Sequence, residues 1–149
     1  MRLDPSCAGR TYPPAPPYRV TAEAVAAFAD AIGDDNPVYR DPQAARGFGH
    51  DAVPAPPTFP IVLTVSGTQA LVDDPQLGLD FARVVHGEQK FSYSRPVYVG
   101  DELVAQTSIE SIRSLAGNDM LTTRTEVRTV GGEPVLSARA VLVVREVGV

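Results

Sequence analysis

The sequence has one cysteine, two histidines and no tryptophan among its 149 residues. A lone cysteine, Cys7, cannot form a disulfide within the chain, which makes the cytoplasm the expected location. The two histidines, His50 and His86, lie far apart, so the spacing of a Cys/His metal site is missing. We therefore expect neither a metal nor a cofactor.

Long apolar runs and an excess of positive charge are missing as well. No apolar run approaches the roughly 20 residues of a membrane span, and Met1–Pro5 lacks the apolar stretch of a signal peptide. The formal net charge of -5 argues against a nucleic-acid partner, because binding to a phosphate backbone rests on Lys and Arg. With 44% hydrophobic and 21% charged residues, the chain fits one globular domain over residues 1–149.

Proline is present but unevenly distributed, with nearly all of it in the first half of the chain. That half is therefore expected to consist of helices and loops. Pro13–Pro17 predicts a stiff, extended opening segment. Thr21 is a plausible N-cap for a helix that ends near Gly33. Residues 33–57 follow as a long polar loop with a short helix near 43–46, and loops of this length are usually functional.

Alternating apolar residues mark the second half as strands. Residues 103–109, 121–127 and 136–144 each place an apolar or threonine side chain on one face at every second position. Gly117–Asn118 and Gly131–Gly132 lie where hairpin turns are needed. These segments predict an antiparallel sheet of five or more strands with one buried face.

Residues 57–72 are apolar most of the way round a helix, which predicts a buried helix. Their β-branched content leaves a strand as the other reading. An antiparallel sheet with one buried face needs a cover, and this helix is the obvious one. The predicted fold class is α+β, with a curved antiparallel sheet wrapped around a long central helix.

Three segments resemble the MaoC-like hydratase/dehydratase family, whose fold is the hot dog. They are Gly-Asp-Asp-Asn-Pro-Val-Tyr-Arg-Asp at 33–41, Ala-Pro-Pro-Thr-Phe at 55–59, and Arg-Pro-Val-Tyr-Val-Gly-Asp-Glu-Leu at 95–103. The resemblance covers roughly residues 18–145. All three segments occur in the order the family has them, on the elements where the family places them.

Within that family the chain resembles members without catalytic residues. Residues 55–59 and His86–Gln89 are typical of the N-terminal half of two-domain MaoC dehydratases. They are also similar to the substrate-holding subunit of bacterial heterodimeric (3R)-hydroxyacyl-ACP dehydratases of fatty-acid synthesis. The resemblance implies an acyl-CoA or acyl-ACP substrate. It also implies a dimer through a sheet edge, either with a second copy or with a catalytic MaoC-like subunit.

Dehydration of a β-hydroxyacyl thioester needs a base, an acid and donors for the thioester oxygen. By resemblance, Asp34 occupies the family's carboxylate position and is vestigial here, because Tyr39 stands where active members have histidine. A phenol with a reference pKa near ~10 is a poor base. Pro57 aligns with the glycine whose N–H serves the oxyanion, and proline has no N–H. Two of the three catalytic elements are therefore missing.

The resemblance further implies substrate contacts from Asn36, Pro57, Thr58, Phe59, His86 and Gln89. A structural role competes for several positions. Asn36 and Asp41 can shape a turn through their own side chains, and His86 can be a hydrogen-bonded structural histidine. His50 is expected on a surface loop. The cations Arg83, Lys90 and Arg95 can reach the phosphates of CoA or of a phosphopantetheine carrier, or simply be solvated.

The sequence thus predicts a substrate-binding, non-catalytic subunit of a (3R)-hydroxyacyl-thioester dehydratase, a hydro-lyase active only as a heteromer. The first alternative is a self-sufficient hydratase that pairs Asp34 with His86. The second is an acyl-CoA-binding hot-dog module that has no enzymatic partner.

Overall fold

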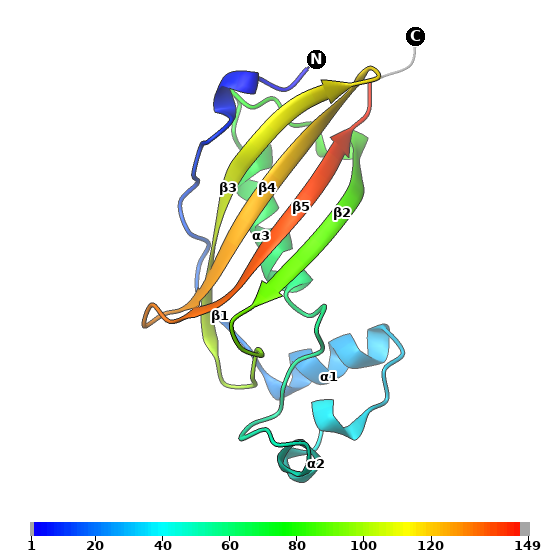
Figure 1. Cartoon of the computed structure of the whole chain (residues 1–149), viewed down its shortest axis with the longest axis vertical. Coiled ribbons are helices and arrows are strands. Elements are labelled where there is room, and N and C mark those ends of the chain that lie inside the picture. Colours follow the sequence, from blue (N-terminus) through cyan, green and yellow to red (C-terminus); the bar gives the residue numbers. More distant parts are fainter. Residues whose placement is uncertain (1, 147–149) are drawn as a thin grey trace.

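The computed structural model describes residues 2–146, and a five-stranded antiparallel sheet dominates it. The strand order is β1-β3-β4-β5-β2, and the sheet curves across the helix α3 (Figure 1). The α+β architecture predicted from the sequence is confirmed. In chain order the elements are η1 Pro5–Cys7, β1 Tyr18–Arg19, α1 Ala22–Ala31, η2 Pro37–Tyr39, α2 Pro42–Gly47, α3 Ile61–Val72, η3 Phe81–Arg83, β2 Val84–Tyr93, β3 Glu102–Leu115, β4 Asn118–Thr129 and β5 Pro134–Val144.

The strands follow the predicted alternation. On β3, for example, Leu103, Ala105, Thr107 and Ile109 are all buried. The hairpin between β3 and β4 turns one residue earlier than predicted, because Leu115 already pairs with Asn118. The turn residues Ala116 and Gly117 have φ of 51° and 82°, the positive values that a tight two-residue hairpin requires.

The first helix begins directly after Thr21, the residue predicted as its N-cap. The Thr21 hydroxyl oxygen accepts a hydrogen bond from the backbone N–H of Ala24 at 3.1 Å, and α1 runs from Ala22 to Ala31. Gly33 follows with a φ of 73°, which suits the stop after a helix. The short helix predicted near 43–46 is α2, which runs from Pro42 to Gly47.

The helix predicted over 57–72 starts later, at Ile61, and this corrects the expected boundary. Residues 57–60 form a turn instead, closed by a hydrogen bond from Phe59 N–H to the Pro56 carbonyl. Prolines in this stretch lack the N–H groups that a longer helix would use. The helix is also buried on one side only, since Val65 is 61% exposed. No helix within residues 2–146 is long and apolar enough to cross a membrane.

The proline-rich opening segment runs along the outer edge of β3. Backbone N–H groups of this segment donate to β3 carbonyls at 2.8–2.9 Å, in the pairs Gly9 to Ile109, Tyr12 to Thr107 and Ala15 to Ala105. The opposite edge of the sheet is β2, whose ladder partner among the described residues is β5 alone. The sheet therefore has one covered edge and one free edge.

Candidate functional site

A cavity of about 340 Å³ lies between α3 and the concave face of the sheet. One face of α3 lines it at helical spacing, with Ile61, Thr64, Val65, Thr68, Gln69 and Val72. The opposite wall comes from η3 and the strands, with Phe81, Val84, His86, Gln89, Thr107, Thr123, Thr125, Ala138, Ala140 and Leu142. Apolar and polar side chains each supply half of this lining, and a concave site with apolar walls and convergent polar groups is the usual form of a small-molecule site.

The cavity exists because α3 leans toward one half of the sheet. Gly67 faces β3 so closely that a Cβ atom there would lie 2.3 Å from the hydroxyl oxygen of Thr107. On the other half, Ala138 and Ala140 of β5 are too small to reach the helix, and space remains over β5 and β2. The sequence pattern of apolar alternation does not reveal this asymmetry, because both halves alternate equally well.

A β-bulge decides which β2 side chains enter the cavity. His86 pairs with Leu142 and Gln89 pairs with Ala140, and the register shifts between His86 and Glu88. Residues three apart on a regular strand point to opposite faces. The extra residue, Gly87, brings both His86 and Gln89 to the concave face.

Most polar groups that line the cavity are already hydrogen-bonded within the chain. The hydroxyls of Thr107 and Thr125 lie 2.9 Å apart, and the Thr68 hydroxyl donates to the carbonyl of Thr64 at 3.2 Å. Gln89 differs, because its amide nitrogen and oxygen are both buried and without a hydrogen-bond partner among the described residues. An unpaired buried amide lowers the stability of a fold by about 1–3 kcal/mol. A functional role for Gln89 would explain why the fold tolerates this cost.

The loop that carries the family's catalytic motif is held by its own side chains. Asp34 Oδ1 accepts from the Asn36 N–H at 3.0 Å, and Asn36 Oδ1 accepts from the Val38 N–H at 3.0 Å. Asp41 caps α2 through the N–H of Gln43 at 2.9 Å. The turn-forming role weighed for Asn36 and Asp41 is therefore present in the structure.

Tyr39 is half-buried and packs against the core cluster that contains Phe59. Burial raises the pKa of its phenol, and the nearby Asp34 carboxylate raises it further. A phenol held in its protonated form near neutrality can donate a hydrogen bond but cannot remove a proton.

The segment aligned with the oxyanion donor lies ahead of the helix rather than at its first turn. Pro57 is exposed, and its carbonyl accepts a hydrogen bond from the Tyr93 hydroxyl at 2.6 Å. Thr58 is exposed, whereas Phe59 is 1% exposed and stacks edge-on against Phe28. Pro57 borders a second hollow, of about 250 Å³, that Arg95 also lines.

The structure does not bring Asp34 and His86 together within one chain. His86 pairs with Leu142, which belongs to a core cluster with Leu3 and Cys7 near the chain termini. The motif loop follows α1, which lies beyond the opposite end of the sheet (Figure 1). No group of three His, Cys, Asp or Glu side chains within residues 2–146 is arranged to hold a metal ion.

Comparison with known proteins agrees with this architecture. The model of the family described as FAS1-like, dehydratase domain region, matches residues 6–138. The chain belongs to this family. It is 53% identical over 145 residues to a UPF0336 protein of Streptomyces avermitilis, covering 97% of both chains.

Two solved structures show the fold. A chain of the HadBC (3R-hydroxyacyl-ACP dehydratase) complex from Mycobacterium tuberculosis superposes with a TM-score of 0.79 and 30% identity, over 96% of this chain and 99% of that one. A MaoC-like dehydratase gives a TM-score of 0.85 and 28% identity, over 94% of this chain and 42% of that longer one. The sheet that curls around α3 is thus the hot-dog fold, as the family resemblance implied.

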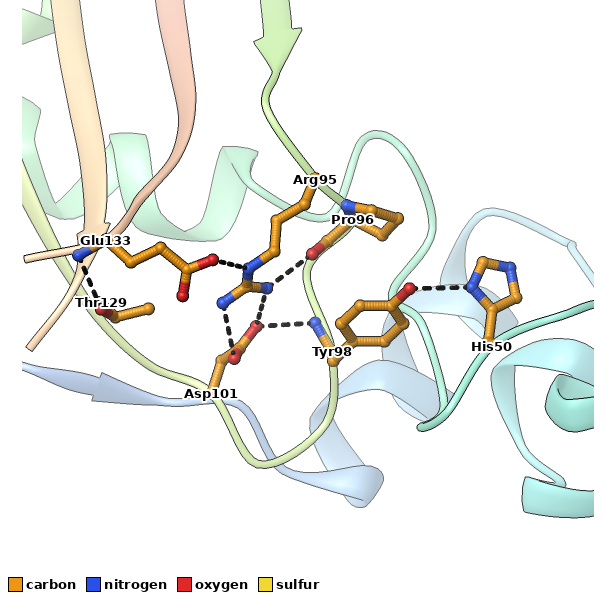
Figure 2. Close-up of polar contacts among 7 residues, drawn as sticks. All are labelled: His50, Arg95, Pro96, Tyr98, Asp101, Thr129 and Glu133. Carbon is orange, nitrogen blue, oxygen red and sulfur yellow. Dashed lines mark hydrogen bonds and ion pairs between the residues drawn. The ribbon is translucent and has the colours of Figure 1, made fainter. Parts of the chain in front are cut away.

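This FAS1-like dehydratase chain has a polar cluster that the sequence reading missed (Figure 2). Arg95 donates two hydrogen bonds to the Asp101 carboxylate, at 2.9 and 3.0 Å, and a third to Glu133 at 2.9 Å. The Asp101 carboxylate also accepts from the Tyr98 N–H at 2.9 Å. These bonds fix the segment after β2, so the 95–103 motif is structural here. The signal was present, because Arg95 and Asp101 both belong to that motif.

The structure corrects the expectation for His50 and gives the three cations partners within the chain. His50 is half-buried rather than a free surface residue, and its Nδ1 lies 3.0 Å from the Tyr98 hydroxyl (Figure 2). The three cations considered for phosphate binding are engaged within the chain: Arg95 with Asp101, Lys90 with Glu88, and Arg83 with the carbonyl of Arg145.

Proposed function

We propose that this chain is the substrate-holding, non-catalytic subunit of a cytoplasmic (3R)-hydroxyacyl-thioester dehydratase. The cavity along α3 carries the proposal. It offers a hollow along α3 that an acyl chain can occupy. The loop that would perform catalysis, residues 33–41, instead uses the Asp34, Asn36 and Asp41 side chains for hydrogen bonds to its own backbone and to the start of α2. A site built to bind without reacting has this combination.

The loss of chemistry follows from two positions. Tyr39 holds its proton near neutrality because the pKa of a phenol is about 10, and burial raises that pKa further. The general base is therefore missing, a loss of about 10²–10⁴-fold. Pro57 offers no N–H for the oxyanion, a loss of about 10²–10³-fold. Asp34 remains, but a carboxylate without its partner base is vestigial.

The free edge of the sheet supports a partner subunit. Exposed large apolar side chains occur on the elements near this edge, Val62 and Val65 on α3, Phe81 on η3, and Val85 and Tyr93 on β2. An exposed strand edge with apolar neighbours invites strand pairing. The related HadBC protein is a complex of (3R)-hydroxyacyl-ACP dehydratase subunits. We propose the same kind of assembly here, in which a MaoC-like subunit with Asp and His intact supplies the catalysis.

An activity assay on a short trans-2-enoyl-CoA tests the proposal. We expect no hydration by the purified chain above a heat-inactivated control, and hydration once a catalytic MaoC-like subunit is co-expressed. Turnover by the chain alone that disappears in Asp34→Asn would overturn the proposal in favour of a self-sufficient hydratase. Acyl-CoA binding without any complex formation would favour an acyl-binding module instead.

A further inference from the structure

We propose that Gln89 recognises a hydrogen-bonding group, a hydroxyl or an amide, on the molecule that fills the cavity along α3. The inference rests on the proposed function and sharpens it, since it names which acyl compounds the cavity prefers. A plain saturated chain would leave the Gln89 amide unpaired, whereas a chain or carrier arm with a polar group at that depth would pair it.

The unpaired amide is unusual in its surroundings. Thr64, Thr68 and Gln69 on the helix side each use their polar atoms within the chain, with the Ile61 carbonyl, the Thr64 carbonyl and Asp73 as partners. On the sheet side Thr107 and Thr125 pair with each other. Both polar atoms of Gln89 lack such a partner. His86 and Thr123 also line the cavity without a side-chain hydrogen bond, but within residues 2–146 Gln89 is the residue whose polar side-chain atoms are both buried and unpaired.

The backbone holds Gln89 at that place. The bulge at Gly87 turns Gln89 inward, and a Cβ atom on Gly87 would lie 3.2 Å from the carbonyl oxygen of Val141 and 3.3 Å from Val143. A side chain at this position would press on the neighbouring strand. The glycine therefore permits a bulge that a regular strand would not have.

The chemistry of the free amide defines the ligand class. The nitrogen of Gln89 donates and its oxygen accepts. A partner that satisfies both must itself accept and donate, as a hydroxyl or a secondary amide does, whereas a ketone only accepts. A hydroxyl on the acyl chain and an amide of a pantetheine arm are the two sources of such a group.

The depth of Gln89 makes both sources feasible. The cavity-lining face of α3 runs from Ile61 to Val72, about 16 Å at the usual helical rise. An extended chain advances about 1.2 Å per bond, so about a dozen bonds fit along it. Gln89 of β2 pairs with Ala140 of β5, and Ala140 pairs with Thr123 of β4. Thr123 lies two residues along β4 from Thr125, whose partner Thr107 faces Gly67 of α3. That places Gln89 near the middle of α3.

Calorimetric titration of the wild-type chain and of Gln89→Met tests the inference. Methionine has a similar length without the amide. The probes are dodecanoic acid, dodecanoic acids hydroxylated at successive carbons, and dodecanoyl-pantetheine. Lys90→Met is the matched control, because it makes the same change to methionine at the next position of β2, whose side chain is exposed and points to the opposite face of the sheet. Thermal unfolding of the unliganded variants shows that each one folds.

We expect Gln89→Met to weaken one hydroxylated acid about tenfold, the loss typical of one buried hydrogen bond, and to leave dodecanoic acid unchanged. A selective loss for dodecanoyl-pantetheine would identify the amide as the source and support the same inference. Equal loss for every probe, or loss for none, would overturn the inference while the binding of dodecanoic acid upholds the proposed function. If the wild-type chain binds no probe, both proposals fail.

Discussion

The two halves of the sheet differ in how their outer strand edges are covered and in how closely α3 packs against them. On the β3 side the outer edge is covered by the chain's own opening segment, and α3 touches the strand through Gly67 and Thr107. On the β2 side the outer edge is free, and a cavity separates the helix from the sheet. The β3 half has its edge and its inner face covered by other parts of the chain, whereas the β2 half has an unpaired edge and an open cavity.

The β3 half contributes mainly to stability, and the β2 half has the features expected of a binding region. The closed half buries the helix against β3 and satisfies the strand edge, so it holds the fold together. The open half has exposed apolar side chains, a bulged strand and an unpaired amide, each of which costs stability in the isolated chain. Features that lower stability and cluster in one region are a reason to look for a ligand and a partner there.

The largest expected effect comes from charging the open edge. Val62→Glu together with Val85→Glu should weaken self-association or assembly with a catalytic subunit by at least about 10²-fold, because an unpaired charge buried in an interface costs about 3–5 kcal/mol. Size-exclusion chromatography with light scattering across micromolar concentrations measures it, and the unchanged protein should run near twice the chain mass. The matched control is Val130→Glu with Leu115→Glu, two exposed apolar residues at hairpin turns. Equal weakening by both pairs would refute the assignment of the edge.

The second expected effect tests the closed half. Gly67→Ala places a methyl group within 2.3 Å of the Thr107 hydroxyl oxygen, and that oxygen is held by Thr125. Alanine improves helix propensity by about 1 kcal/mol over glycine, but the overpacking costs about 1–3 kcal/mol. We expect a net fall in the free energy of unfolding, measured by urea titration. Gly131→Ala is the control, since its nearest contact would be an ordinary 3.7 Å, and a more stable Gly67→Ala variant would contradict the close approach.

A third change fills the open half. Ala140→Leu extends a side chain into the cavity from β5 and should weaken the binding of dodecanoic acid about tenfold, with a cost to folding of about 1–3 kcal/mol at most. Ser137→Leu enlarges the same strand on the opposite face and should leave binding unchanged. Calorimetry measures both variants. Unaltered affinity in Ala140→Leu would show that acyl chains do not occupy this cavity.

The smallest expected effect concerns the hydrogen bonds that join the opening segment to Asp74, which follows α3. Asp74 accepts hydrogen bonds from Tyr12 and Arg10, and these lower its pKa from 3.8 to about 2. A carboxylate with a lowered folded-state pKa stabilises the fold above its unfolded pKa, and this contribution disappears as the pH falls from about 4 to about 2. Asp74→Asn should therefore lower Tm at neutral pH, and its difference from wild type should shrink across that window. The exposed Asp35→Asn variant, measured alongside, controls for the removal of one negative charge.

Much of the fold was readable from the sequence because its signals are local. The alternation on β3, β4 and β5, the Thr21 cap and the glycine pair at 131–132 each act within a few residues, and the structure has them where they were predicted. The start of α3 was misplaced because prolines between 56 and 60 turn the chain before the helix can form. The family motifs identified the hot-dog fold.

The sequence by itself determined the class of the fold, the strands and the family, because each depends on residue types at short spacing. Tertiary structure alone decided that the opening segment covers β3, that α3 leans away from β2 and that the Gly87 bulge turns His86 and Gln89 to the same face. These outcomes depend on contacts between residues far apart in the chain. Sequence spacing does not encode which half of a sheet a helix approaches, and packing between distant side chains does.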